Sequence, residues 1–249
     1  MVDYKKLTKC PLVSITIELR HDSNIQFGEL YNVINTKLAS RIKEKNTHGI
    51  LTIPRDVRFN DTNLKYKPIQ SFKIDNGCVW NFSEDGIFLQ YSFDPIFKGE
   101  FYSGWENLNL SSEIKLVVDC LKALGVKSTT YLGYRVLNMF EGSKIFQHSN
   151  IDIKLNSKDL TAESENILIS NEINKSSLKL KYIIAVNSKI IHPMKEFKGS
   201  YIDIDVSYNE FITTDTNDEL VFKRVCQLHD EEKNCFFSIL KESFVETLN

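Results

Sequence analysis

Residues 201–206 read YIDIDV, and the stretch that follows them has the pattern of the longest helix in the chain. The period of two predicts a half-buried strand, with Asp203 and Asp205 together on the face opposite the isoleucines. Apolar residues then recur at spacings of three, four or seven, at Val221, Val225, Leu228, Cys235 and Ile239. This spacing predicts an amphipathic helix. A helix that continues to Leu248 would be about 45 Å long at about 1.5 Å per residue, which is enough to cross a sheet.

Two sequences of the form Ser/Thr-x-x-Glu predict helix starts. Thr216 and Glu219 precede the C-terminal helix, and Ser103 and Glu106 precede a second helical pattern that ends before Gly125. In such a capping box each of the two side chains accepts a hydrogen bond from a free backbone N–H group. Gly125 is the residue type that most readily ends a helix in the left-handed conformation.

The rest of the chain shows strand patterns in runs, with helices between them. Alternation predicts strands at residues 13–20, 70–74, 78–82, 87–93, 129–140, 151–155, 167–169, 178–186 and 201–206. Helical spacing predicts a first helix over residues 27–42. Residues 50–68 are predicted to be a long connection with one short strand, and residues 187–200 an exposed loop.

Runs of strands with three interspersed helices are typical of the α+β class. We expect a large, twisted, mainly antiparallel sheet with about three amphipathic helices on one face and a long C-terminal helix. The 249 residues suit a single domain, residues 1–249. A weak twofold repeat would divide it into halves 1–142 and 143–249.

Composition excludes several classes of protein. The chain has 31 basic and 33 acidic residues and a net charge of −2, which is not the footprint of a general nucleic-acid binder. Its five cysteines are scattered and form no Cys-x-x-Cys pair, which favours reduced thiols over zinc ligands or disulfides. No signal-peptide pattern and no membrane-span pattern is present, so a cytoplasmic protein without membrane association is expected.

One candidate chemical site is a metal site. Asp203 and Asp205 lie on one face of a strand, and His229 in the last helix is the natural third ligand. Two carboxylates and an imidazole can hold a divalent cation that activates water, as in a hydrolase or nuclease. The alternative is that both aspartates face water on the outer side of the sheet and that His229 has a structural role.

A second candidate site binds an anion or a protein partner. Arg135, with Asn138 beside it, lies on one predicted strand, and Glu18 and Arg20 lie on another. Charged residues on a sheet face require partners, so an ion pair of Arg135 with Glu18 or Asp203 is the structural interpretation. The functional interpretation is a binding surface made of Arg135, Asn138, Glu18 and Arg20.

Lys179 and Lys181 share one strand face with Ile183 and could form a basic strip for a nucleotide or nucleic acid. Such binding would depend steeply on salt. No Gly-rich phosphate loop, Gly-x-Ser-x-Gly elbow or His-Glu-x-x-His motif is present. The sequence therefore favours no cofactor and no catalytic residue.

Several segments together resemble a sporadically distributed prokaryotic family of about 250–270 residues that has no assigned activity. They are residues 11–20 (PLVSITIELR), 102–106 (YSGWE), 132–138 (LGYRVLN), 202–205 (IDID), Leu228-His229, and Phe236 or Phe237. Val136 stands where the family usually places an aromatic residue. The family's scattered occurrence implies carriage on mobile or defence-associated loci, and it supplies no catalytic residue.

These observations favour a non-catalytic recognition or regulatory subunit. Its partner would be a protein from the same operon, in a mobile-element, phage-defence or toxin–antitoxin-like system. A homo-oligomer is compatible with the same reasoning. The alternatives are the metal-dependent hydrolase and the nucleotide or nucleic-acid binder.

Overall fold

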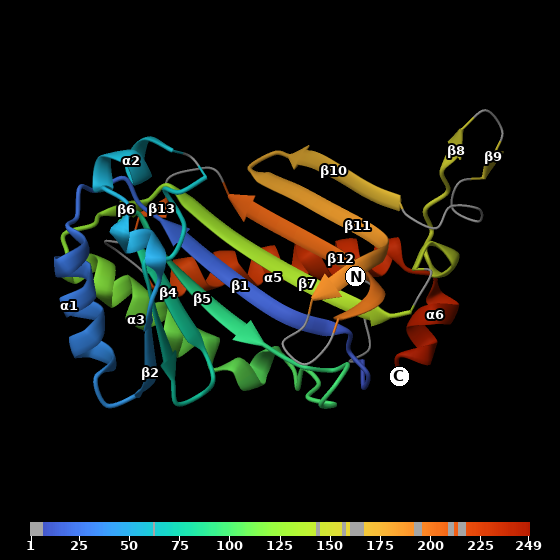
Figure 1. The fold of residues 1–249 in the computed structure, drawn as a ribbon, viewed down its shortest axis with the longest axis horizontal. Coiled ribbons are helices and arrows are strands. Elements are labelled where there is room, and N and C mark those ends of the chain that lie inside the picture. Colours follow the sequence, from blue (N-terminus) through green and yellow to red (C-terminus); the bar gives the residue numbers. More distant parts are fainter. Residues whose placement is uncertain are drawn as a thin grey trace.

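The structure is a computed structural model that describes residues 7–61, 63–142, 145–155, 158–159, 167–191, 196–208, 212–213 and 218–249 (Figure 1). Within these residues, nine strands form one antiparallel sheet in the order β10-β11-β12-β7-β1-β5-β4-β3-β2. The α+β class and the large antiparallel sheet predicted from the sequence are confirmed.

The strands of the sheet fall into two groups along the chain. The first group is β1 (Leu12–Arg20), β2 (Ile42–Thr47), β3 (Gln70–Ile74), β4 (Val79–Ser83) and β5 (Gly86–Ser92). The second is β7 (Tyr131–Glu141), β10 (Ile167–Lys175), β11 (Leu178–Ile191) and β12 (Glu196–Tyr208). Short pairs form outside the sheet, namely β6 (Ser128–Thr129) with β13 (Ile212–Thr213), and β8 (Lys154–Leu155) with β9 (Lys158–Asp159).

The two groups join at the centre of the sheet, where β7 lies between β1 and β12. Ile17 pairs with Tyr134 across one side of β7, and Ile204 pairs with Val136 across the other. All four side chains are buried, because alternation turns them toward the helices. One continuous sheet therefore connects the two predicted halves of the chain.

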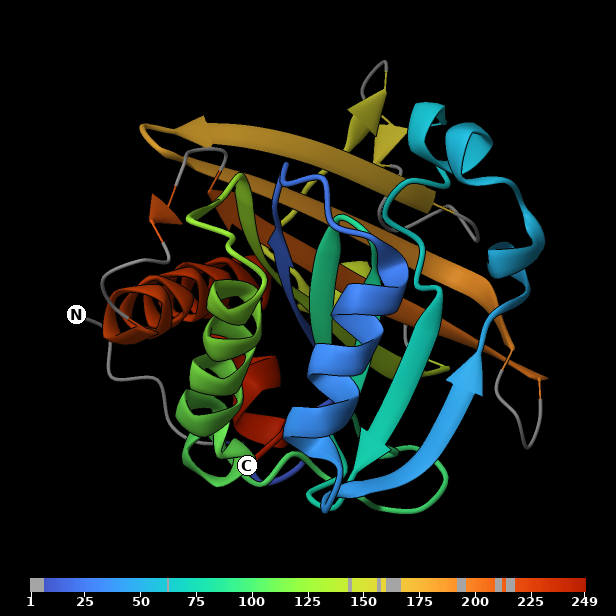
Figure 2. The same ribbon diagram turned by 90° about the vertical axis from the view of Figure 1, so that its left-hand side faces the viewer.

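Three longer helices cover one face of the sheet (Figure 2). They are α1 (Phe27–Leu38), α3 (Leu110–Ala123) and α5 (Asp218–Ile239), and α5 packs against β7 and β12. The apolar positions of α5 predicted from the sequence, Val221, Val225, Leu228, Cys235 and Ile239, are all buried. We call the opposite side of the sheet the open face.

The C-terminal helix is shorter than predicted. It ends at Ile239, and the chain turns at Lys241 into a separate helix, α6 (Glu242–Thr247). The backbone N–H of Lys241 donates to the carbonyl of His148 at 2.8 Å, so the turn is held by the body of the protein. The 22 residues of α5 span about 33 Å.

Three other segments also differ from prediction. The first helix ends at Leu38, because Ile42 already pairs with Ile74 in the sheet. The connection at residues 50–68 contains η1 (Gly49–Thr52) and the short helix α2 (Arg55–Asn60) rather than a strand. The predicted loop at residues 187–200 is mostly strand, since Ile191 still pairs with Glu196.

The two predicted capping boxes have different outcomes. Thr216 lies outside the described residues. At the other site, Trp105–Leu108 form a 3-10 turn, η2, before α3 begins, and the N-cap of η2 is Gly104 with φ 121° and no side-chain cap. Ser103 therefore does not cap this helix. Gly125 has φ 75°, as expected of the left-handed end of α3.

A buried carboxylate connects the helix layer to the sheet. Glu113 of α3 has no exposed surface and accepts hydrogen bonds from Arg41 at 2.5 Å, Asn76 at 2.9 Å and Trp80 at 3.1 Å. A buried charge with several donors avoids most of its desolvation penalty. The carboxylate thereby fixes α3 over the β3–β4 end of the sheet.

Candidate functional site

The open face carries a charged pair at its centre. Arg135 on β7 donates from Nε to Asp203 Oδ1 at 2.8 Å and from Nη2 to Asp203 Oδ2 at 2.6 Å. The Arg135 side chain is 60% exposed, whereas that of Asp203 is 9% exposed. Arg135 stands directly opposite Asp205 in the register and reaches diagonally to Asp203, the next residue on that face of β12. One of the two ion pairs considered from the sequence is therefore present.

Arg20 and Glu18 form a second pair next to it on β1. The Arg20 guanidinium lies between two rings, 3.9 Å from the centroid of Tyr66 and 4.1 Å from that of Tyr131. Gly133 makes room for the Tyr131 ring, because a Cβ at this position would be 2.6 Å from its Cε1 and Oη atoms. Arg20 is thus held between two rings (cation–π contacts) and beside a carboxylate, and a quarter of its side chain is exposed.

Burial raises the pKa of Glu18 and of Asp205, which both lie on this face. Arg20 and Arg135 act in the opposite direction on both. In the register, Asp205 is flanked by Arg135 on β7 and Lys181 on β11. Acids and bases therefore alternate across the strands, and neither sign of charge predominates.

Asn138 does not join this cluster, which corrects the prediction that it lies beside Arg135. The two residues are three apart on β7, and an odd separation places side chains on opposite faces of a strand. Asn138 is 3% exposed and lies under the helix layer.

His229 is also on the helix side, so the structure does not bring it together with Asp203 and Asp205. Its ring stacks on Trp105 with centroids 4.1 Å apart and lies edge-on to Tyr134 at 5.8 Å. The two aspartates do share the open face, as predicted, but the sheet separates them from His229. No group of three or more His, Cys, Asp or Glu side chains suited to a metal ion occurs among the residues that the structure describes.

The predicted basic strip is interrupted by acids. Lys179 pairs with Glu172 at 3.0 Å across β10 and β11, and Lys181 stands opposite both Glu172 and Asp205. Lys179 and Lys181 do share the open face with Ile183, but this pairing does not favour a phosphate-binding track.

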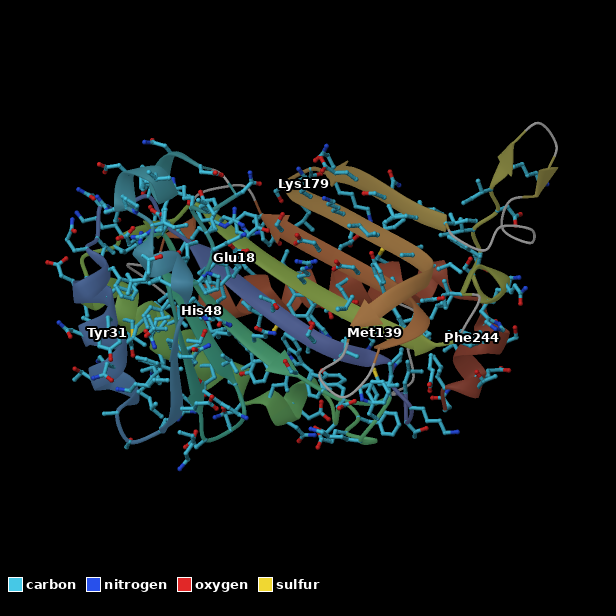
Figure 3. All side chains as sticks on the ribbon, viewed as in Figure 1. Glu18, Tyr31, His48, Met139, Lys179 and Phe244 are labelled. Carbon is cyan, nitrogen blue, oxygen red and sulfur yellow. The ribbon has the colours of Figure 1, made fainter. Side chains whose placement is uncertain are left out.

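An apolar patch adjoins the charged pair on the open face, and we call it the open-face patch. It consists of Leu137, Met139, Leu168, Ile183 and Tyr201, which strand alternation and register place on the same side as Asp203. Figure 3 looks onto this face and labels Glu18, Met139 and Lys179 there. Leu168, on the outer strand β10, is 66% exposed, and the other four are partly exposed.

A second feature, not predicted from the sequence, lies under the helix layer. Glu232 of α5 is 6% exposed, and burial raises its pKa to about 8. Burial also lowers the pKa of His229, one turn earlier, to about 4. Both side chains are therefore uncharged at neutral pH. The burial of Glu232 could have been predicted from the helical pattern, since Glu232 lies four residues after Leu228 on the apolar stripe.

Comparison with known proteins finds no match to a family model, a curated protein or a solved structure. No helix in the described part of the chain is both long enough and apolar enough to cross a membrane.

Proposed function

We propose that this protein is a non-catalytic recognition or regulatory subunit whose open face binds a protein partner. The observation that carries the proposal is the composition of that face. The open-face patch places aliphatic, Met and Tyr side chains beside an exposed arginine, and aromatic residues, Met and Arg are enriched in protein interfaces. No described helix lies over this part of the sheet (Figures 1 and 2).

Arg135 is suited to a role in recognition. Asp203 fixes the guanidinium through two of its nitrogens, and Nη1 makes no hydrogen bond to any described residue. Holding the side chain in place before binding reduces the entropy lost in the complex. The exposed N–H groups can then donate to a carboxylate or a backbone carbonyl of the partner.

The partner we propose is a product of the same operon, in a mobile-element, phage-defence or toxin–antitoxin-like system. This part rests on the family resemblance of the sequence motifs. The mixture of charges on the open face supports a protein partner over a nucleic acid, because Lys179, Arg20 and Arg135 are each paired with a carboxylate.

The test is affinity purification of the tagged protein from its host, with mass spectrometry and light scattering on the eluate. We expect a stoichiometric protein from the same operon. Leu168→Lys, on the open face, should remove most of it. Leu220→Lys is the matched control, because this leucine is also exposed but lies on α5. A monomer that captures nothing from its operon, or a partner retained equally by both variants, would contradict the proposal.

A homo-oligomer that Leu168→Lys dissociates would make a second copy of this chain the occupant of the open face. In that case the partner would be a second copy of this chain rather than an operon product, and the open face would still be the binding surface.

A further inference from the structure

A cavity of about 220 Å³ lies under the helix layer, between α5, the η2 turn and strands β1 and β7. It is on the opposite side of the sheet from the open face. Its walls are mainly apolar and aromatic, with Leu12, Ile15, Tyr102, Trp105, Val136 and Phe236 among them. Cavities of this composition with a few convergent polar groups are the usual form of small-molecule sites.

One buried polar atom in the cavity wall lacks a hydrogen-bond partner among the described residues, and one buried acid lies beside it. The Nδ2 atom of Asn138 is buried and makes no hydrogen bond there. Glu232 also lines the cavity, and its pKa is set by burial and by the charge of Lys233, with no hydrogen bond from a described residue contributing. Native proteins leave few buried polar groups unpaired, so the Nδ2 atom of Asn138 is a donor that a bound molecule could satisfy.

The aromatic wall is uncharged, and its rings contact one another. His229 stacks on Trp105, and Trp105 lies edge-on to Tyr134 with ring centroids 5.7 Å apart. His229 is neutral because burial lowers its pKa, and Glu232 is protonated because burial raises its pKa. The charged residues in the lining, Glu106 and Lys233, are exposed and partly exposed respectively. The buried part of the cavity therefore offers hydrogen bonds without a net charge.

We propose that this cavity binds a small uncharged molecule that carries a carbonyl group on an aromatic or branched aliphatic body. A rotation of the buried Asn138 side chain toward the cavity would let its Nδ2 donate an N–H to the carbonyl oxygen. The protonated Glu232 side chain has one O–H donor and one carbonyl acceptor, which match the two polar atoms of a primary amide or lactam. A cavity of about 150 Å³ is known to hold benzene, so this volume suits a ligand of about ten non-hydrogen atoms.

The test uses benzamide as the probe and ethylbenzene as the matched compound without polar atoms. Both are titrated into the full ¹⁵N-labelled chain, and shifts of the Asn138 side-chain amide and the Trp105 indole N–H are followed. We expect saturable binding of benzamide with a Kd on the order of 1 mM, and binding of ethylbenzene at least tenfold weaker.

Asn138→Leu removes the donor while keeping the size of the side chain. It should reduce benzamide affinity at least tenfold and leave ethylbenzene affinity within about threefold, since a lost hydrogen bond to a buried partner costs far more than a changed apolar contact. If this variant does not fold, nuclear Overhauser effects between benzamide and the Trp105 and Tyr134 rings in the wild-type protein decide the question. Absence of saturable shifts at these rings, or equal affinity for both probes, would overturn the proposal.

Discussion

Replacement of Glu232 by Gln should stabilise the protein, and the gain should grow with pH. The folded pKa of Glu232 is about 8, against an ordinary value of 4.5. A carboxyl group whose pKa is raised by folding contributes its full stability below the unfolded pKa and loses it as pH rises toward the folded pKa. Gln has the same shape and does not titrate, so it avoids this loss.

The size of this stability difference follows from the pKa shift of Glu232. Each pH unit between 4.5 and 8 costs the wild type about 1.4 kcal/mol relative to Glu232→Gln. The variant should therefore be more stable by about 3 kcal/mol at pH 7 and by about 4 kcal/mol at pH 8, and nearly equal to the wild type at about pH 4.5. Lys233 acts in the opposite direction on this pKa and is unchanged in the variant.

Urea unfolding of both proteins at pH 5, 6, 7 and 8 measures the difference directly. Glu231→Gln is the control, because Glu231 is the neighbouring carboxylate on α5, partly exposed and paired with Lys175. It should change the free energy of unfolding by less than about 1 kcal/mol at every pH. A Glu232→Gln difference that is constant between pH 5 and 8, or that favours the wild type, would refute the assignment of a buried, protonated carboxyl group.

Three further perturbations follow from the same structure. His229→Phe should become more stable than the wild type as pH falls from 6.5 to 4, by up to about 3 kcal/mol, because the wild type loses stability in that window; urea unfolding at pH 5 and 7 checks it. Arg135→Ala should cost about 1–2 kcal/mol by leaving the buried Asp203 carboxylate unpaired, a figure discounted for the exposure of the arginine. The double variant with Asp203→Asn should recover most of that loss in chemical denaturation. Gly133→Ala should lower the free energy of unfolding by about 1–3 kcal/mol, because its Cβ would displace the Tyr131 ring; an unchanged thermal midpoint would contradict this packing.

The sheet and the apolar face of α5 could be predicted because local periodicity determines them. Residues 201–206 alternate without interruption, and every predicted inward residue of this strand is buried. The end of α5 could not be predicted, because the helical pattern continues through Leu240 and Phe244. The break there depends on a hydrogen bond from Lys241 to His148, about ninety positions earlier in the chain.

In the candidate sites, too, local patterns specify some features, and contacts between distant segments specify the others. The position of Arg135 relative to Asp203 follows from strand alternation plus a register that single-sequence patterns do not specify. The placement of Asn138 beside Arg135 is wrong on strand parity alone, since the two residues are an odd number of positions apart on β7. The grouping of His229 with the aspartates is wrong because the helical pattern does not show on which face of the sheet α5 packs.

The position of β7 has a consequence for how the chain folds. The meander β2–β5 and the hairpins β10–β12 each pair strands that are neighbours in sequence. Their junction pairs Glu18 with Gly133, and Asp205 with Arg135, so the centre of the sheet closes only after widely separated segments meet. Non-local pairings of this kind slow folding, since chain entropy is lost before the contacts form. During synthesis, the edge of β1 that pairs with β7 therefore stays unpaired until β7 has emerged, and an unpaired strand edge is open to mispairing.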